Sequence, residues 1–208
     1  AIRSTYWDGI SLVPAVSDLF GAEFDLPSRQ VGNKGFEFWN VLNNGIDTAR
    51  LEYDVIIIDT PPALSYITIN ALMAADGIIM PLPPNALDFL SSGQFWGLVS
   101  SLTNQLQNHG SKKKFDFLDV VLSKVDPDDT ATPVVREWIK AAYADKLMSV
   151  EIPLTASAGS ASAEFGTVYD QPRKRATAAY DRFVELVEDQ VNFAWARQMA
   201  VIGSKEAA

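Results

Sequence analysis

One strand-like segment ends in the side chains best suited to chemistry. A continuous run of mostly β-branched residues forms the segment 53–59, which ends at Asp59 and is followed by Thr60-Pro61-Pro62. Because the apolar residues do not alternate with polar ones, the run predicts a strand buried on both faces of a parallel sheet. Asp59 would emerge at the carboxyl end of that strand, where ligands bind in open α/β sheets. A carboxylate there can hold Mg²⁺ through water and orient nucleotide phosphates, or it can simply complete a turn.

The rest of the chain alternates between strand-like and helical patterns. The expected strands are 9–14, 77–82, 115–122 and 148–152, and the expected helices are 36–51, 66–75, 87–107, 133–144 and 177–202. This order predicts an α/β fold, in which a mainly parallel sheet has helices on both faces. At 208 residues the chain is expected to belong to one domain, residues 1–208.

The last predicted helix has one apolar stripe. We expect this stripe to pack on the sheet, because the polar face of the helix is acidic and an anionic membrane would repel it. The stripe consists of Tyr180, Val184, Val187, Val191, Trp195, Met199 and Ile202.

The composition excludes several classes of site. Without cysteine the chain has no disulfide framework, cysteine-based zinc site or thiol nucleophile, and His109 is its one histidine. No run approaches the roughly 18 apolar residues of a membrane helix, and no signal peptide is recognisable, so we expect a cytoplasmic protein. The net charge of −9 argues against a surface devoted wholly to nucleic acid. Lys112-Lys113-Lys114 and Arg173-Lys174-Arg175 could still form local basic patches, with a solvated loop as the alternative for each.

Several segments together resemble the ParA/MinD family of P-loop ATPases, and they occur in the family's order. The matching segments are 53–64 (Walker B and switch II), 70–77, 81–89 (particularly like the larger plasmid and chromosome partition ATPases), 151–155 (the strand and nucleotide-base loop), and 163–169 with 178–181 (the closing loop and C-terminal helix). The resemblance covers nearly the whole chain. It is strongest to partition proteins of the ParA type.

This resemblance implies an ATPase that hydrolyses ATP during plasmid or chromosome partition. It implies ATP and Mg²⁺ as ligands, with Asp59 coordinating Mg²⁺ through water and Thr60, Pro61 and Pro62 beginning the switch that senses the γ-phosphate. It also implies a homodimer that binds DNA nonspecifically, responds to a ParB-type centromere-binding protein and associates with the nucleoid. A membrane-binding variant is not expected.

The resemblance also places residues at two further sites. Ser123 and Lys124 would lie near adenine, together with Pro153 and Leu154 of the nucleotide-base loop. For Ser123 and Lys124, a plain transition from strand to loop is an alternative interpretation. Arg173-Lys174-Arg175 precedes the last helix, where the family carries basic residues that contact DNA.

The phosphate-binding loop of the family has no match in the sequence. Its Gly-x-x-x-x-Gly-Lys-Ser/Thr pattern is missing, and the glycine-lysine cluster at 32–35 has the wrong spacing. The chain therefore resembles the C-terminal portion of a ParA-type domain, incomplete at its N-terminus, whose missing strands belong in the central sheet. We expect the isolated chain neither to bind ATP tightly nor to hydrolyse it. The alternative is a noncatalytic dimerisation or adaptor module with a ParA-like fold.

Overall fold

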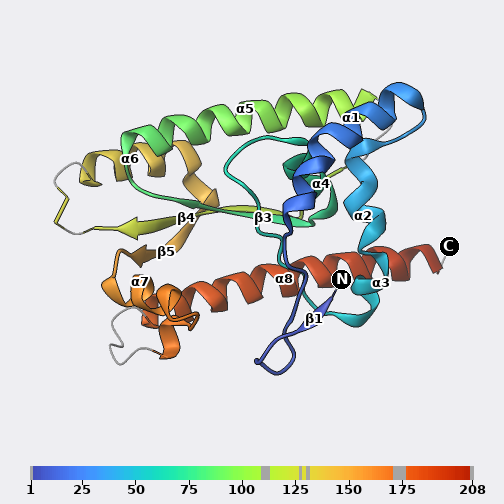
Figure 1. Cartoon of the computed structure of the whole chain (residues 1–208). Helices are drawn as coiled ribbons and strands as arrows, with labels where there is room; N and C mark the ends of the chain where they lie inside the picture. Colours follow the sequence, from blue (N-terminus) through green and yellow to red (C-terminus); the bar gives the residue numbers. More distant parts are fainter. Residues whose placement is uncertain (1, 109–112, 127, 130–131, 171–176, 207–208) are drawn as a thin grey trace. The chain divides into compact units, whose positions relative to one another are not determined.

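The computed structural model describes residues 2–108, 113–126, 128–129, 132–170 and 177–206 (Figure 1). Its contacts divide the chain into two compact units, residues 1–75 and 76–208, and each unit is described by itself. No helix in the described part of the chain is both long and apolar enough to cross a membrane.

The second unit is built on three parallel strands in the order β3-β4-β5. The strands are β3 (Gly77–Leu82), β4 (Phe117–Val125) and β5 (Leu147–Pro153). The helices between and after them are α5 (Ala86–Asn108), α6 (Thr132–Tyr143), η3 (Ala144–Lys146), α7 (Ala156–Ala163), η4 (Val168–Asp170) and α8 (Thr177–Glu206). Because parallel neighbours need crossover connections, the alternating pattern of the sequence gives this topology. The predicted parallel α/β fold is confirmed.

Successive residues of β4 point to opposite faces of the sheet and build two cores. Val120 and Leu122 face one side, where they join a cluster with Val135 and Ile139 of α6. Val121 faces the other side, where α8 covers the sheet. Figure 1 shows α5 and α6 on one face of the sheet and α8 on the other. The predicted placement of helices on both faces is therefore also confirmed.

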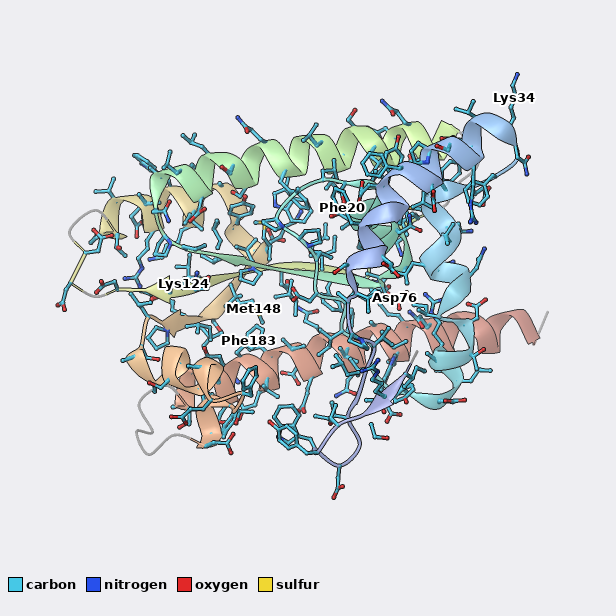
Figure 2. The ribbon with its side chains drawn as sticks, in the orientation of Figure 1. Phe20, Lys34, Asp76, Lys124, Met148 and Phe183 are labelled. Atoms are coloured by element: carbon cyan, nitrogen blue, oxygen red, sulfur yellow. The ribbon has the colours of Figure 1, made fainter. Side chains whose placement is uncertain are left out.

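The packed face of α8 differs from the predicted stripe. The α8 residues against the sheet are Ala179, Tyr180, Phe183 and Leu186, and Figure 2 labels Phe183 together with Met148 of β5. Val184 and Met199 of the predicted stripe are exposed. The prediction was wrong for these residues because α8 has apolar side chains on more than one face, so spacing alone did not identify the buried one.

The first unit contains a short hairpin and a set of helices. The antiparallel strands are β1 (Arg3–Ser4) and β2 (Ser11–Leu12), and the helices are η1 (Ser17–Gly21), α1 (Ala22–Gly32), η2 (Phe38–Asn40), α2 (Val41–Gly45), α3 (Asp47–Glu52) and α4 (Tyr66–Ala74). The single helix predicted over 36–51 is divided, with α2 ending at Gly45. The predicted helix 66–75 is confirmed as α4.

The strand predicted over 53–59 is absent from the structure. Residues 53–59 belong to no strand, and Val55 and Ile57 are 53% and 90% exposed. A parallel strand is stabilised by ladders with its neighbours, and none of the described residues forms a ladder with this segment. The β-branched run therefore predicted a strand whose partners the described residues do not supply.

Candidate functional site

The residues at the candidate switch form an exposed, irregular segment in the first unit. Asp59 and the following Thr60-Pro61-Pro62 are all exposed. The N–H of Ala63 donates to the carbonyl of Pro61 at 2.8 Å, and the hydroxyl of Thr68 donates to the carbonyl of Ala63 at 2.6 Å. The downstream end of the segment is thus tied to the first turn of α4.

The first turn of α4 has all of its backbone donors satisfied. The N-cap residue Ser65 accepts from the N–H of Thr68 through its hydroxyl and from the N–H of Ile69 through its carbonyl. The N–H groups of Tyr66 and Ile67 donate to the two carboxylate oxygens of Glu23, each at 3.0 Å. Glu23 lies in the first turn of α1, so this hydrogen-bond pair joins two helices.

The pKa of Glu23 reflects this arrangement. Burial raises it, but hydrogen bonds from the Ile67 amide, the Ser65 hydroxyl and the Tyr66 amide outweigh burial and hold the pKa below its ordinary value. Glu23 therefore contributes stability as a carboxylate. That contribution is present above the unfolded-state pKa and is lost as the pH falls through the folded-state pKa.

The buried Asn70 fixes the middle of α4. Its amide NH₂ donates to the carbonyls of Phe38 and Tyr66 at 2.8 and 2.9 Å, and its oxygen accepts the N–H of Leu42 at 3.0 Å. The C-terminal end is held by Arg50, whose guanidinium donates to the carbonyl of Ala74 at 2.9 Å. Asp59 to Leu64 therefore leads into a helix that is anchored along its whole length.

The second unit brings together four residues of the predicted nucleotide site. Ser123 and Lys124 are the last residues of β4 before Val125, and Pro153 ends β5 with Leu154 directly after it. Val125 is in register with Pro153, and its carbonyl accepts the N–H of Leu154 at 2.9 Å. This is the carboxyl edge of the parallel sheet, as the sequence predicted.

Lys124 has an unusual backbone conformation at this edge. Its φ is +52°, in the left-handed region that glycine adopts readily and other residues rarely do. The side chain is exposed, and Figure 2 shows it at the end of β4. Strained residues of this kind concentrate at binding and catalytic sites, so the conformation adds a structural observation to the predicted role of Lys124.

Some predicted residues cannot be placed. Arg173-Lys174-Arg175 lies outside the described residues, and so do His109 and Lys112. Asp59 and the Ser123–Leu154 edge lie in separate units. The predicted roles of Arg173-Lys174-Arg175, of Asp59 and of the Ser123–Leu154 edge therefore stay predictions.

The chemistry of the first unit is compatible with Mg²⁺. Among the described residues no group of three or more His, Cys, Asp or Glu could hold a metal ion. Mg²⁺ bound with a nucleotide needs only one or two carboxylates, since waters and phosphate oxygens complete its shell. The exposed carboxylate of Asp59 and the neighbouring hydroxyl of Thr60 fit that requirement.

Sequence reasoning did not identify Glu23 or Asn70. The partners of Glu23 lie 43 and 44 residues further along the chain, so no local pattern signals the pairing. Asn70 begins one of the family-like segments, and its polar side chain in an apolar helix was a usable signal. Both residues act on the helix that follows the candidate switch.

A family model for the AAA domain matches residues 1–112, which is more than half of the chain. One of the curated relatives is named for chromosome partitioning. The chain is 42% identical to the chromosome partitioning protein ParA of Myxococcus xanthus over 148 residues, which cover 69% of the chain and 47% of that protein. The chain belongs to the ParA/MinD family of P-loop ATPases.

Two other ParA/MinD relatives match almost the entire chain. The sporulation initiation inhibitor protein Soj of Bacillus subtilis is 28% identical over 86% of the chain and 67% of its own length. Protein SopA of Escherichia coli is 26% identical over 92% of the chain and 50% of its own length. The chain thus spans about half the length of several curated relatives that it matches.

Solved structures give the same fold. A partition protein matches with a TM-score of 0.71 at 22% identity, over 93% of this chain and 49% of its own. A cobyrinic acid a,c-diamide synthase from Mycobacterium smegmatis, with bound ADP and magnesium, matches with a TM-score of 0.60 at 28% identity, over 76% of this chain and 60% of its own. The fold is that of P-loop NTPases.

Proposed function

We propose that the intact protein is an ATP-dependent DNA partition ATPase. One observation carries this proposal: a chromosome partitioning protein ParA matches 69% of the chain and the fold of a solved partition protein matches 93% of it, with the chain's elements in the family's order. The chain would be the C-terminal portion of a single ATPase domain, 1–208. Hydrolysis of ATP would be coupled to dimerisation and to nonspecific DNA binding.

Asp59 and the residues after it form the metal side of the proposed site. Bound Mg²⁺ would neutralise charge that develops on the phosphates during transfer. Asp59 would hold the ion through water, and Thr60, Pro61 and Pro62 would start the switch that responds to the γ-phosphate. Their exposure and the absence of regular structure between Asp59 and α4 support this role.

The edge formed by β4 and β5 is the proposed base-binding part of the site. Ser123 and Lys124 would contact adenine from one strand end, and Pro153 and Leu154 from the next. The register of the two strands and the hydrogen bond between Leu154 and Val125 support their acting together.

The proposed partners are nonspecific DNA, a ParB-type centromere-binding protein and a second copy of the protein. Arg173, Lys174 and Arg175 would bind DNA phosphates, and the protein would be associated with the nucleoid in the cytoplasm. For the isolated 208-residue chain we expect neither tight ATP binding nor hydrolysis, because the phosphate-loop pattern is missing from its sequence.

The DNA-binding part can be tested on the intact protein with ATP and Mg²⁺ over a range of salt concentrations. Replacing Arg173, Lys174 and Arg175 with glutamate should weaken binding to every DNA sequence and reduce the slope of log K against log salt by up to about 3. The matched control replaces Lys112, Lys113 and Lys114 with glutamate and should change binding little. Unchanged DNA affinity in the variant at residues 173–175 would show that these residues do not bind DNA. Failure of the wild-type protein to hydrolyse ATP would favour the noncatalytic dimerisation module instead.

A further inference from the structure

The N-terminus of α4 is held to another helix through one side chain. Tyr66 and Ile67 are the first two residues of α4, so their N–H groups have no acceptor within the helix. Both donate to the carboxylate of Glu23 in α1 at 3.0 Å. Negative charge at a helix N-terminus is also favoured by the helix dipole.

The other hydrogen bonds at this turn are local. The N–H groups of Thr68 and Ile69 bond to Ser65, and the Thr68 hydroxyl bonds to the carbonyl of Ala63. These groups would move with α4 if the helix shifted. Among the described residues, Glu23 is the one that ties the backbone N–H groups of this turn to a distant element.

Glu23 sits on a face of α1 that is already anchored. Leu26 lies three residues further on, on the same face, and is buried, and α1 packs against α4. The Glu23 carboxylate therefore holds the first turn of α4 to a packed helix and not to a loose loop. Directly upstream of the turn lies the irregular, proline-containing segment after Asp59.

We propose that Glu23 is the positioning residue that fixes the downstream end of the switch and confines its nucleotide-driven rearrangement to residues 59–64. This inference rests on the proposed ATPase function. With Glu23 in place, movement that begins at Asp59 must be absorbed before Ser65. Without it, the first turn of α4 becomes free to follow the switch, and the phosphate-sensing residues lose their fixed support.

Hydrogen exchange in the intact protein tests the proposal, with and without a nonhydrolysable ATP analogue and Mg²⁺. The variants are Glu23→Gln and Glu23→Ala, and the matched control is Asp25→Asn, an exposed carboxylate in the same turn of α1. Without nucleotide, the amides of Tyr66 and Ile67 should exchange about fivefold faster in both Glu23 variants, the effect expected from loss of a helix cap. Asp25→Asn should match the wild-type protein.

Exchange measured with the ATP analogue shows whether Glu23 limits the movement of the switch or only caps helix α4. In the wild-type protein and in Asp25→Asn it should change exchange within residues 59–64 and stop there. In the Glu23 variants the change should extend into residues 65–69, and kcat for ATP should fall at least about threefold while KM stays within about twofold. A generally loosened fold would instead speed exchange throughout α1 and α4.

Two results would overturn the inference. One is wild-type exchange at Tyr66 and Ile67 in both Glu23 variants, which would show that Glu23 does not hold these amides. The other is a pair of Glu23 variants in which Tyr66 and Ile67 exchange faster, but the analogue still changes exchange only up to residue 64 and kcat is unchanged. If the analogue changes nothing in residues 59–64 of the wild-type protein, the proposed ATPase function is overturned, and so is the proposed effect of Glu23 on the switch. The comparison without nucleotide would still show whether Glu23 holds the amides of Tyr66 and Ile67.

Discussion

The ring of Phe117 in β4 lies directly over Gly77 in β3. The two residues are paired in register, and a Cβ atom at position 77 would lie 2.1 Å from Cζ of Phe117. Any side chain at Gly77 must therefore push the ring away. This pair fixes the start of the parallel ladder between β3 and β4.

Replacing Gly77 with alanine should destabilise the second unit by about 1–3 kcal/mol, the usual cost of overpacking. The measurement is the free energy of unfolding in urea. Adding Phe117→Leu should recover part of the loss, because the smaller side chain leaves room for the new methyl group. Gly97→Ala is the matched control, since a Cβ at Gly97 meets nothing within 4 Å, and there we expect a gain of up to about 1 kcal/mol in helix α5. Equal effects at both glycines would contradict this interpretation of the pair.

A second prediction concerns the buried Asp119 in β4. Its side chain is 8% exposed, and its Oδ2 has no hydrogen-bond partner among the described residues. Burial raises the pKa of Asp119 above its ordinary value, against the opposing effect of a hydrogen bond with Gln190. A raised folded-state pKa means that the wild-type protein loses stability as the pH rises from below the unfolded-state pKa through the folded-state value.

Asp119→Asn should therefore raise the free energy of unfolding at pH 7, by about 1 kcal/mol. The advantage should shrink as the pH is lowered toward the ordinary carboxyl pKa, because the wild-type side chain becomes neutral there. Asp189→Asn, an exposed carboxylate on α8, is the control and should change little at either pH. A less stable Asp119→Asn protein at pH 7 would show that the carboxylate is required for packing.

A third prediction separates the backbone of Lys124 from its side chain. Lys124→Gly and Lys124→Ala both remove the amine, but only glycine relieves the left-handed conformation with φ +52°. The glycine variant should be more stable than the alanine variant by about 1 kcal/mol. In the intact protein both variants should bind ATP more weakly by a similar factor. Wild-type ATP affinity in both would remove Lys124 from the proposed base site.

The second unit was largely predictable from the sequence. The strand predicted over 77–82 has the same bounds in the structure, because Gly77 and the prolines after Leu82 delimit a short apolar run. The segments 122–126 and 151–155 were expected at strand ends, and in the structure β4 and β5 end there, at one edge of the parallel sheet. These features depend on local pattern and on general topology, and both were available in the sequence.

The first unit was harder to predict, for physical reasons. The run at 53–59 favours a strand, but strand formation needs neighbouring strands, and periodicity does not say which residues supply them. Helix α1 was not predicted because it contains Pro27, which lacks an N–H group and usually interrupts a helix. The link from Glu23 to α4 depends on two segments about 40 residues apart, and no local signal encodes it.

The central claim is that Asp59 is the magnesium-side carboxylate of an ATPase. It is tested most directly by Mg²⁺-dependent ATP hydrolysis of the intact protein, comparing the wild type with Asp59→Asn and with Asp54→Asn, an exposed aspartate five residues earlier. We predict that kcat falls about 100-fold or more in Asp59→Asn and stays within about twofold in Asp54→Asn. Wild-type hydrolysis by Asp59→Asn would contradict the claim.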